Sequence, residues 1–240
     1  TGAGAGIGKA IAETFAKEGA KVVVNDLNAD TAQAVADGIG KAGGTAAFVQ
    51  ADVSKEADAV KIVKFAVDTY GSLDILVNNA GIELIKPTHD LTEQDWDSVM
   101  NVNLKGCFLV SKHGVIRMLA QGGGSIINMA SAAGIIGFPL LASYCATKGG
   151  VVQLTKAMAV EWARFNVRTV CIAPSYIVTE MAKRDIEANP QILEQNLKKI
   201  PMRRGGEPRE VGDVCVFLAS DAASFVTGET IAIDGGWLAW

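Results

Sequence analysis

The sequence opens with Thr1-Gly2-Ala3-Gly4-Ala5-Gly6-Ile7-Gly8, a glycine-rich stretch that leads into an amphipathic segment over residues 9–19. Glycine adopts positive φ readily and lets backbone N–H groups approach an anion at a helix N-terminus. Residues 21–25 then predict a buried strand, and Asp26 stands at its end, 18 residues after Gly8. This order predicts a dinucleotide-binding unit in which Asp26 binds the adenosine ribose hydroxyls.

The glycine-rich turn does not identify the protein class by itself. Its spacing is G-x-x-x-G-x-G, formed by Gly2, Gly6 and Gly8, and differs from the usual G-x-G-x-x-G. Methyltransferases also place such a turn before a helix and an acid after the next strand. The turn therefore leaves an oxidoreductase and a methyltransferase open.

A second motif favours an oxidoreductase. Of the three tyrosines, only Tyr144 has a lysine four residues on, Lys148. On a helix these side chains share a face. An ammonium held there would favour the phenolate and lower the tyrosine pKa from about 10 to near 7. Tyr144 would then exchange protons with an alcohol at neutral pH.

Further motifs, in order along the whole chain, resemble the short-chain dehydrogenase/reductase family. They comprise Thr1-Gly2-x-x-x-Gly6-Ile7-Gly8, Asp52-Val53, Asn78-Asn79-Ala80-Gly81, Asn103 within 101–104, Ser131 within 128–131, Tyr144-x-x-x-Lys148 thirteen residues beyond that serine, residues 174–179 and Asp234-Gly235-Gly236. The chain is identified as a member of this family, and a methyltransferase would have no need for Ser131, Tyr144 and Lys148.

The resemblance implies four catalytic residues. Tyr144 would be the general acid/base, while Lys148 would lower its pKa and hold the nicotinamide ribose. Ser131 would hydrogen-bond the reacting oxygen and stabilise developing charge. Asn103 would hold a water molecule that connects Lys148 to solvent.

The resemblance also implies a nicotinamide cofactor, with NAD preferred over NADP. Asp26 would repel a 2′-phosphate, and neither Ala5 nor Leu27 offers the cation that NADP-using members often carry. The expected cofactor contacts are Gly2, Gly4, Gly6, Ile7, Gly8, Asp26, Asp52, Val53, Asn79, Tyr144, Lys148, Ile177 and Thr179.

The substrate is expected to be a secondary alcohol or ketone, with a sugar acid or polyol among the options. Residues 161–163 and 234–237 resemble gluconate 5-dehydrogenase-like members. The alternative is a 3-oxoacyl carrier-protein reductase, although Gly122 and Phe165 stand where that group has carrier-docking arginines. A more distant alternative is a non-catalytic dinucleotide sensor. Candidates for the substrate pocket are Glu83, Ala133, Ile136, Tyr176 and Met181.

Composition agrees with one soluble α/β enzyme domain over residues 1–240. Apolar residues make up 49% of the 240, and the net charge of −4 argues against nucleic acid as a partner. The four cysteines lack a C-x-x-C pattern and are expected to be reduced, mostly buried thiols in the cytoplasm. With two histidines and no clustered ligands, no metal site is expected, and no membrane segment is visible.

Strands and helices are predicted to alternate, which gives one doubly wound, Rossmann-type parallel sheet with helices on both faces. The expected strands are 21–26, 45–51, 73–78, 124–130, 167–173 and 230–234, and the helices 7–19, 28–42, 55–70, 93–121, 143–165 and 207–219. Residues 175–206 are expected to cover the substrate. The fold also requires a strand before Thr1, absent from this sequence, which would lie between strands 21–26 and 73–78.

A homotetramer is expected from the resemblance and from Gly149-Gly150 within a predicted helix. Glycine there costs about 1 kcal/mol against alanine, which makes sense where another backbone approaches closely. Close packing within the subunit is the alternative.

Overall fold

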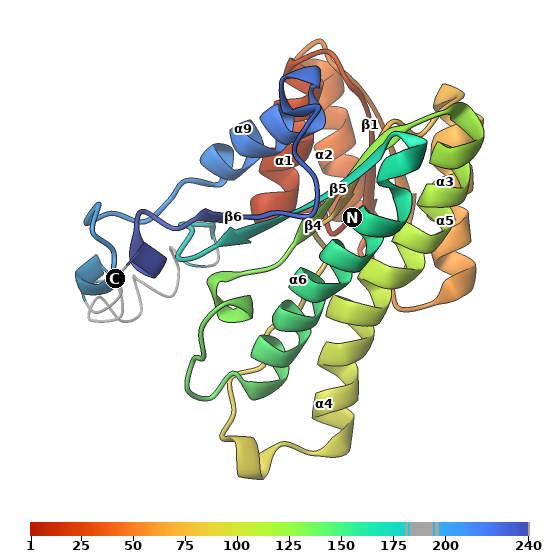
Figure 1. The fold of residues 1–240 in the computed structure, drawn as a ribbon. Coiled ribbons are helices and arrows are strands. Elements are labelled where there is room, and N and C mark those ends of the chain that lie inside the picture. The colour runs from red at the N-terminus through yellow and green to blue at the C-terminus, as the bar shows by residue number, and fades with distance from the viewer. Residues whose placement is uncertain (181, 183–193, 195–196, 240) are drawn as a thin grey trace.

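The structure is a computed structural model, which describes residues 1–180, 182, 194 and 197–239. Within these residues, six strands alternate with helices (Figure 1). The strands are β1 (Lys21–Asp26), β2 (Thr45–Gln50), β3 (Ile75–Asn78), β4 (Gly124–Met129), β5 (Val167–Pro174) and β6 (Thr230–Ile233). The helices are α1 (Gly6–Lys17), α2 (Ala29–Lys41), α3 (Glu56–Tyr70), α4 (Glu93–Met100), α5 (Gly106–Gln121), α6 (Ala142–Trp162) and α9 (Pro208–Ala219). The predicted elements are thus found within a few residues of their expected ends.

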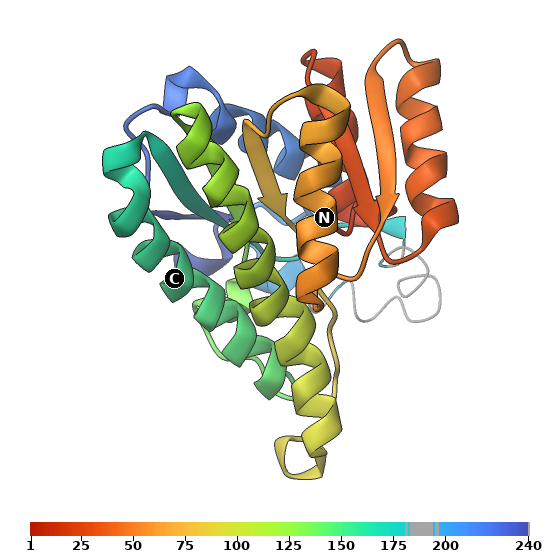
Figure 2. The same ribbon diagram turned by 90° about the vertical axis from the view of Figure 1, so that its right-hand side faces the viewer.

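Every strand pair in the described part of the chain is parallel. The order is β1-β2 in one sheet and β3-β4-β5-β6 in the other. Helices α1 and α9 pack together on one face, while α3, α5 and α6 lie side by side on the opposite face (Figure 2). The doubly wound architecture predicted from the sequence is confirmed.

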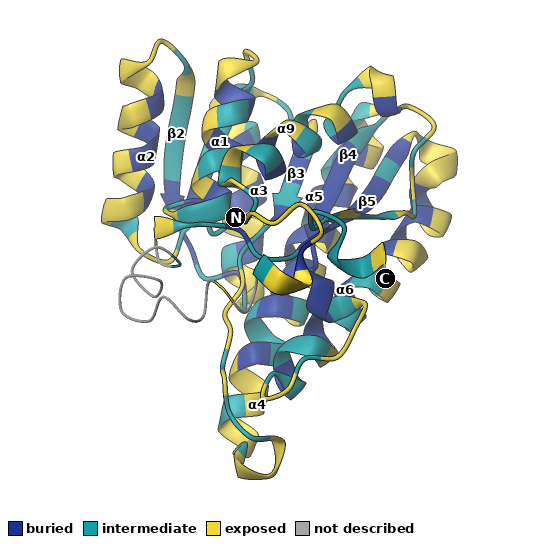
Figure 3. Ribbon diagram, turned by 90° about the vertical axis from the view of Figure 1, so that its left-hand side faces the viewer, coloured by how far each residue is buried: buried dark blue, intermediate teal, exposed yellow. Residues whose placement is uncertain are grey.

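The strand interiors supply the core. Ile126 and Ile127 are adjacent in β4 and fully buried, and they belong to hydrophobic clusters on opposite faces of the sheet. This follows from the two-residue period of a strand, since successive side chains point to opposite faces. Figure 3 shows the buried residues concentrated on the strands and on the inner sides of the helices, with exposed residues on the outer sides.

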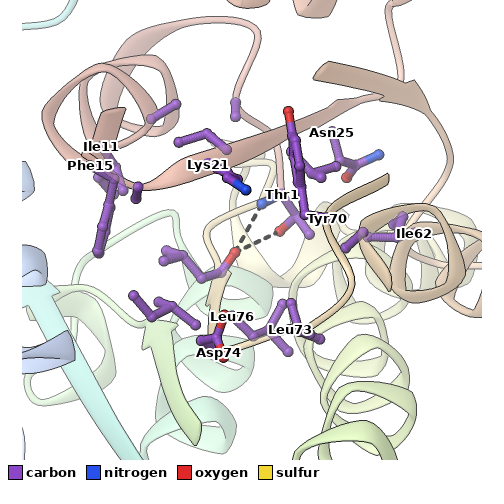
Figure 4. Close-up of a pocket in the computed structure, with 18 of the residues that line it drawn as sticks. Thr1, Ile11, Phe15, Lys21, Asn25, Ile62, Tyr70, Leu73, Asp74 and Leu76 are labelled. Carbon is purple, nitrogen blue, oxygen red and sulfur yellow. Dashed lines mark hydrogen bonds between the residues drawn. The ribbon is translucent and has the colours of Figure 1, made fainter. Parts of the chain in front are cut away.

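The two sheets flank a cavity of about 500 Å³ between β1 and β3. Figure 4 shows Ile11 and Phe15 of α1 on one side of it, with Ile62 and Tyr70 of α3 on the other. At its end, the Thr1 nitrogen donates to the Val77 carbonyl (2.9 Å). Thr1 is thus bonded to β3 at one end of this cavity.

The predicted helix over residues 93–121 is found, with one irregular turn inside it. Between α4 and α5 the helix continues through a π-helical turn over Asn101–Lys105. Such single-turn insertions widen the helix locally and often occur at functional sites. Here the turn contains Asn103, whose contacts are described below.

The expected substrate-covering region is described only in part. Of the expected substrate-covering region 175–206, the structure describes 175–180, 182, 194 and 197–206. Met181 lies outside the described residues.

No helix in the described part of the chain has the length and apolar character needed to cross a bilayer, and the described residues contain no group of three potential metal ligands.

Candidate active site

The glycine-rich turn is held in one conformation by its close contacts. Gly2 and Gly6 have φ of +59° and +55°, which side-chain-bearing residues rarely adopt. A Cβ on Gly8 would lie 2.2 Å from the Gly2 carbonyl oxygen and 2.4 Å from Asn79 Nδ2. That same Nδ2 donates to the carbonyl oxygens of Thr1 (3.0 Å) and Gly2 (2.9 Å). The turn therefore requires glycine where the sequence has it, and Asn79 holds it against β3.

Helix α1 begins at this turn without a cap of its own. Its N-cap residue, Ala5, has no side-chain hydrogen bond, and the first turn contains no acidic residue. The first N–H groups of a helix have no intrahelical acceptor and carry the positive end of the helix dipole. A Cβ on Gly6 would meet only the Thr179 side chain, at 3.6 Å, so the space beside these N–H groups is open.

Asp26 lies at the carboxyl end of β1, beside the turn. Its Oδ2 accepts the Gly4 N–H (2.9 Å) and its Oδ1 accepts the Asn28 N–H (3.0 Å). Each oxygen keeps a further lone pair for another donor. The adjoining surface hollow is lined by Asp26, Leu27, Asn28, Ala29, Asp30 and Gln50, which include two carboxylates and no cation.

Asp52 and Val53 follow β2 and line a cleft that is also lined by Asp26 and the glycine-rich turn. Hydrogen bonds from Ser54 to Asp52 Oδ1, from the backbone N–H (3.0 Å) and the hydroxyl (2.7 Å), hold the pKa of Asp52 below its ordinary value. Val53 is buried against Gly106, where an added Cβ would lie 2.8 Å from a valine methyl. Ser54 therefore holds Asp52 in place, and packing against Gly106 holds Val53.

Tyr144 and Lys148 lie one turn apart on α6, as predicted. Lys148 is buried, its Nζ donates to the Met129 carbonyl (2.8 Å), and it lies 5.5 Å from the centre of the Tyr144 ring. Ser131 follows β4 and lines the same cleft as Tyr144, whose pKa it lowers. The structure thus brings Ser131, Tyr144 and Lys148 together.

The predicted lowering of the Tyr144 pKa by Lys148 is wrong in this structure. Burial raises the pKa of Tyr144 to about 12, and Ser131 opposes this rise. Burial also lowers the pKa of Lys148 to about 8. The ammonium lies over the ring and points at a carbonyl, so desolvation outweighs its effect on the phenol oxygen.

Asn103 is buried in the π-helical turn and uses its side chain as a clamp. Its Oδ1 accepts the Ile82 N–H (2.8 Å), and its Nδ2 donates to the Ile82 carbonyl (2.9 Å) and to Thr147 Oγ1 (3.2 Å). Thr147 in turn donates to the Tyr144 carbonyl (2.8 Å). Asn103 therefore ties the loop after β3 to the helix that carries Tyr144 and Lys148.

A buried polar network supports the floor of the site. Asn78 donates to Ser111 (2.8 Å) and to Asn128 (2.9 Å), and Asn128 donates to Thr155 (2.9 Å). These bonds join β3, α5, β4 and α6. Asn78 Oδ1 is buried and has no hydrogen-bond partner, so the network is satisfied only in part. The bonds that are made tie the ends of β3 and β4, beside Asn79 and Ser131, to α6.

Most of the expected site residues line one cleft of about 530 Å³. They are Gly2, Gly6, Ile7, Gly8, Asp26, Asp52, Val53, Asn79, Ser131, Tyr144, Lys148 and Thr179. Three expected residues do not line it. Gly4 binds Asp26 behind the turn, Asn103 lies beneath the loop after β3, and Ile177 is buried in the core beside α9.

Other lining residues were not expected from the sequence. They include Ala51, Ala80, Ile82, Val102, Met129 and Glu180. Ala51, Ala80 and Met129 lie at or just after the carboxyl ends of β2, β3 and β4, and ligands bind there in open parallel sheets. That rule was available from the sequence. Val102 lies within the motif 101–104, in which only Asn103 was expected at the site, and nothing in the sequence marks Glu180.

Comparisons with known proteins agree with this geometry. A protein-family model described as Enoyl-(Acyl carrier protein) reductase matches residues 2–238. The NAD-dependent glycerol dehydrogenase of Listeria innocua is 41% identical over 237 residues, which cover 99% of this chain and 91% of the relative. The 3-oxoacyl-acyl-carrier-protein reductase of Thermotoga maritima is 42% identical over 237 residues, covering 98% and 95%.

A solved structure extends the similarity to three dimensions. The crystal structure of a gluconate 5-dehydrogenase from Burkholderia cenocepacia, in complex with NADP and tartrate, matches with a TM-score of 0.94 at 36% identity. The match covers 100% of this chain and 94% of that chain. The chain therefore belongs to the short-chain dehydrogenase/reductase family and is an oxidoreductase that acts on CH–OH groups with a nicotinamide cofactor.

Proposed function

We propose that this protein transfers a hydride between NAD and a secondary alcohol or ketone, with Tyr144 as the general acid/base. One observation carries the proposal. Ser131, Tyr144 and Lys148 meet in the same cleft as an uncapped helix N-terminus and the carboxylate of Asp26. The cleft thus combines a proton donor, a donor to a reacting oxygen and a place for a dinucleotide.

The residues present fit such a cofactor. The N–H groups at the start of α1, and the open space beside Gly6, suit a pyrophosphate. Asp26 suits the adenosine ribose hydroxyls, Asp52 and Val53 suit the adenine end, and Lys148 suits the nicotinamide ribose. When bound there, the cofactor accepts or gives the hydride.

The preference for NAD rests on the charges around Asp26. The hollow beside this residue contains the carboxylates of Asp26 and Asp30 and no basic side chain. A 2′-phosphate there would meet two like charges and would lose the hydrogen bond that a 2′-hydroxyl donates to Asp26. The Listeria relative is NAD-dependent, whereas the Burkholderia structure contains NADP, so relatives alone do not decide the preference.

The chain's own groups move the proton and stabilise charge. A Tyr144 with a pKa near 12 is a neutral phenol at pH 7, which suits donation to a carbonyl oxygen during reduction. Ser131 supplies the second hydrogen bond to that oxygen. The water-holding role expected for Asn103 stays a prediction. Each polar atom of its side chain already has a protein partner, so we assign it a positioning role.

The carrier-protein reductase alternative is less well supported. Gly122 occupies one expected carrier-docking position and has φ of +91°, where an arginine would be strained. Phe165 occupies the other, although Arg164 lies over its ring at 4.5 Å and supplies a neighbouring cation. A small alcohol, including a polyol or sugar acid, remains the substrate class of the main proposal.

We also infer a homotetramer in the cytoplasm. Apolar side chains are exposed on α5 and α6, including Ile116 (60% exposed) and Val160 (85%), and a partner would cover them. Gly150 no longer supports a partner, because an added Cβ would meet Leu104 of the same chain at 2.8 Å. All four cysteines are unpaired, which suits a reducing compartment.

The test is a turnover screen that pairs NAD⁺ and NADP⁺ with secondary alcohols, polyols and sugar acids. We expect NAD⁺-dependent oxidation and its loss, to below a few per cent of the wild-type rate, in Tyr144→Phe. That variant should still bind the cofactor, since only the transferable proton is removed. Tight NAD binding without turnover of any substrate would favour the dinucleotide sensor.

A further inference from the structure

Glu83 is fixed at the catalytic end of the cleft by the loop that precedes it. The backbone of Ile82 is bonded at both its N–H and its carbonyl to the Asn103 side chain. The next residue, Glu83, lines the cleft together with Ser131, Tyr144 and Lys148. The clamp therefore positions the backbone next to a residue whose side chain lines the same cleft as Tyr144.

The carboxylate of Glu83 is electrostatically coupled to the catalytic tyrosine. Its negative charge contributes to the raised pKa of Tyr144. The side chain reaches solvent through the open side of the cleft, while the cleft walls desolvate it enough to raise its own pKa. A substrate on Tyr144 thus lies within the influence of this charge.

The cleft offers little to balance that charge. Its described lining residues carry four carboxylates, Asp26, Asp52, Glu83 and Glu180, and one ammonium, Lys148. Lys148 donates to the Met129 carbonyl and faces the proposed nicotinamide ribose. A carboxylate on the substrate would therefore meet like charge at this end, whereas a hydroxyl group would find an acceptor.

We propose that Glu83 is a specificity-determining residue that accepts a hydrogen bond from a second hydroxyl next to the reacting carbinol and excludes substrates with a carboxylate there. The inference rests on the proposed function, because it assigns the substrate of the same site. Within that function it selects neutral diols and polyols over sugar acids.

The test uses three substrates with one four-carbon skeleton. 2-Butanol has one hydroxyl, 2,3-butanediol adds a neighbouring hydroxyl, and 3-hydroxybutyrate ends in a carboxylate. Oxidation with NAD⁺ is followed at 340 nm for the wild type, Glu83→Gln and a matched control, Asp37→Asn. The control removes the same charge from the exposed face of α2, away from the cleft.

We expect wild-type kcat/KM to favour the diol over 2-butanol by about tenfold or more, as a hydrogen bond to a charged acceptor allows. Glu83→Gln should lower that ratio about tenfold and raise the ratio of 3-hydroxybutyrate to 2-butanol by a similar factor. Asp37→Asn should change neither ratio. Ratios in Glu83→Gln within twofold of those in Asp37→Asn would overturn the proposal, as would a wild type that oxidises the acid as well as the diol.

A binding measurement separates this inference from the proposed function. If no protein oxidises any of the three compounds with either cofactor, the proposed function fails. Calorimetric titration of NAD⁺-loaded Tyr144→Phe, with and without Glu83→Gln, then decides the role of Glu83. The role of Glu83 is supported if Tyr144→Phe binds the diol more tightly than the acid and the double variant binds the acid more tightly than the diol. It is refuted if the ratio of the two dissociation constants is the same in both proteins.

Discussion

Gly8→Ala offers a sharp test of the glycine-rich turn. The new Cβ would lie 2.2 Å from the Gly2 carbonyl oxygen, 2.4 Å from Asn79 Nδ2 and 3.0 Å from Ala3 Cα. Ordinary contacts of this kind are about 3.5 Å or longer. The start of α1 must therefore move by about 1 Å away from the backbone of Gly2 and Ala3, and the Asn79 side chain must be displaced.

The expected cost follows from the bonds that such a movement breaks. Asn79 Nδ2 would lose its bonds to the Thr1 and Gly2 carbonyls, at about 1 kcal/mol each, and strained packing would add about 1–2 kcal/mol. Alanine regains about 1 kcal/mol through its better helix propensity. We expect the free energy of unfolding to fall by about 2–3 kcal/mol, and the Kd for NAD to rise by about tenfold or more.

Gly38→Ala is the matched control. Gly38 lies within α2, is exposed, and has no atom within 4 Å of an added Cβ. It should raise the free energy of unfolding by about 0.5–1 kcal/mol and leave the Kd for NAD unchanged. Urea denaturation and fluorescence titration measure both quantities. If Gly8→Ala behaves like Gly38→Ala in both assays, the turn is not held as argued here.

Four further predictions concern the site and the assembly. Asp26→Ala should reduce the NAD⁺-to-NADP⁺ ratio of kcat/KM by about tenfold or more, because repulsion and a hydrogen bond are lost together; a wild type that uses both cofactors equally contradicts this. Asn103→Ala should raise KM for the alcohol and increase hydrogen exchange at Ile82, and an unchanged exchange rate would refute the clamp. Burial lowers the pKa of Lys148 from 10.5 to about 8 in the folded protein. Below about pH 8 the buried ammonium therefore destabilises the folded state, and this destabilisation is lost as the pH rises from about 8 to 10.5. The free energy of unfolding of the wild type relative to Lys148→Met should therefore increase over that range, as urea denaturation at several pH values would detect. Light scattering at micromolar concentration should give a tetramer, and a monomer would contradict the proposed assembly.

Much of the fold was predictable because its signals are local. The strand of residues 21–26 has the predicted bounds, and Tyr144 and Lys148 share a helix face as their spacing requires. The π-helical turn within the helix over residues 93–121 was not predictable from periodicity. It places Asn103 against Ile82, which is 21 residues away in sequence.

The errors at the site have a common origin in tertiary surroundings. Spacing placed Lys148 near Tyr144, but whether its ammonium reaches the phenol depends on the Met129 carbonyl and on burial. The side chain of Ile177 packs into the core, and its expected contact with the cofactor stays a prediction. The sequence suggested that Gly150 contacts another subunit, whereas the side chain that faces it is Leu104 of the same chain.

The Asn103 clamp also has a consequence for how this enzyme can change over evolution. Because Asn103 grips the backbone of Ile82 and not a side chain, the geometry of the loop is independent of which amino acid occupies position 83. A single codon change at this position can therefore exchange the group that faces the substrate while Tyr144 and Lys148 stay in place. Saturation mutagenesis at position 83 is accordingly a compact starting library for new alcohol specificities.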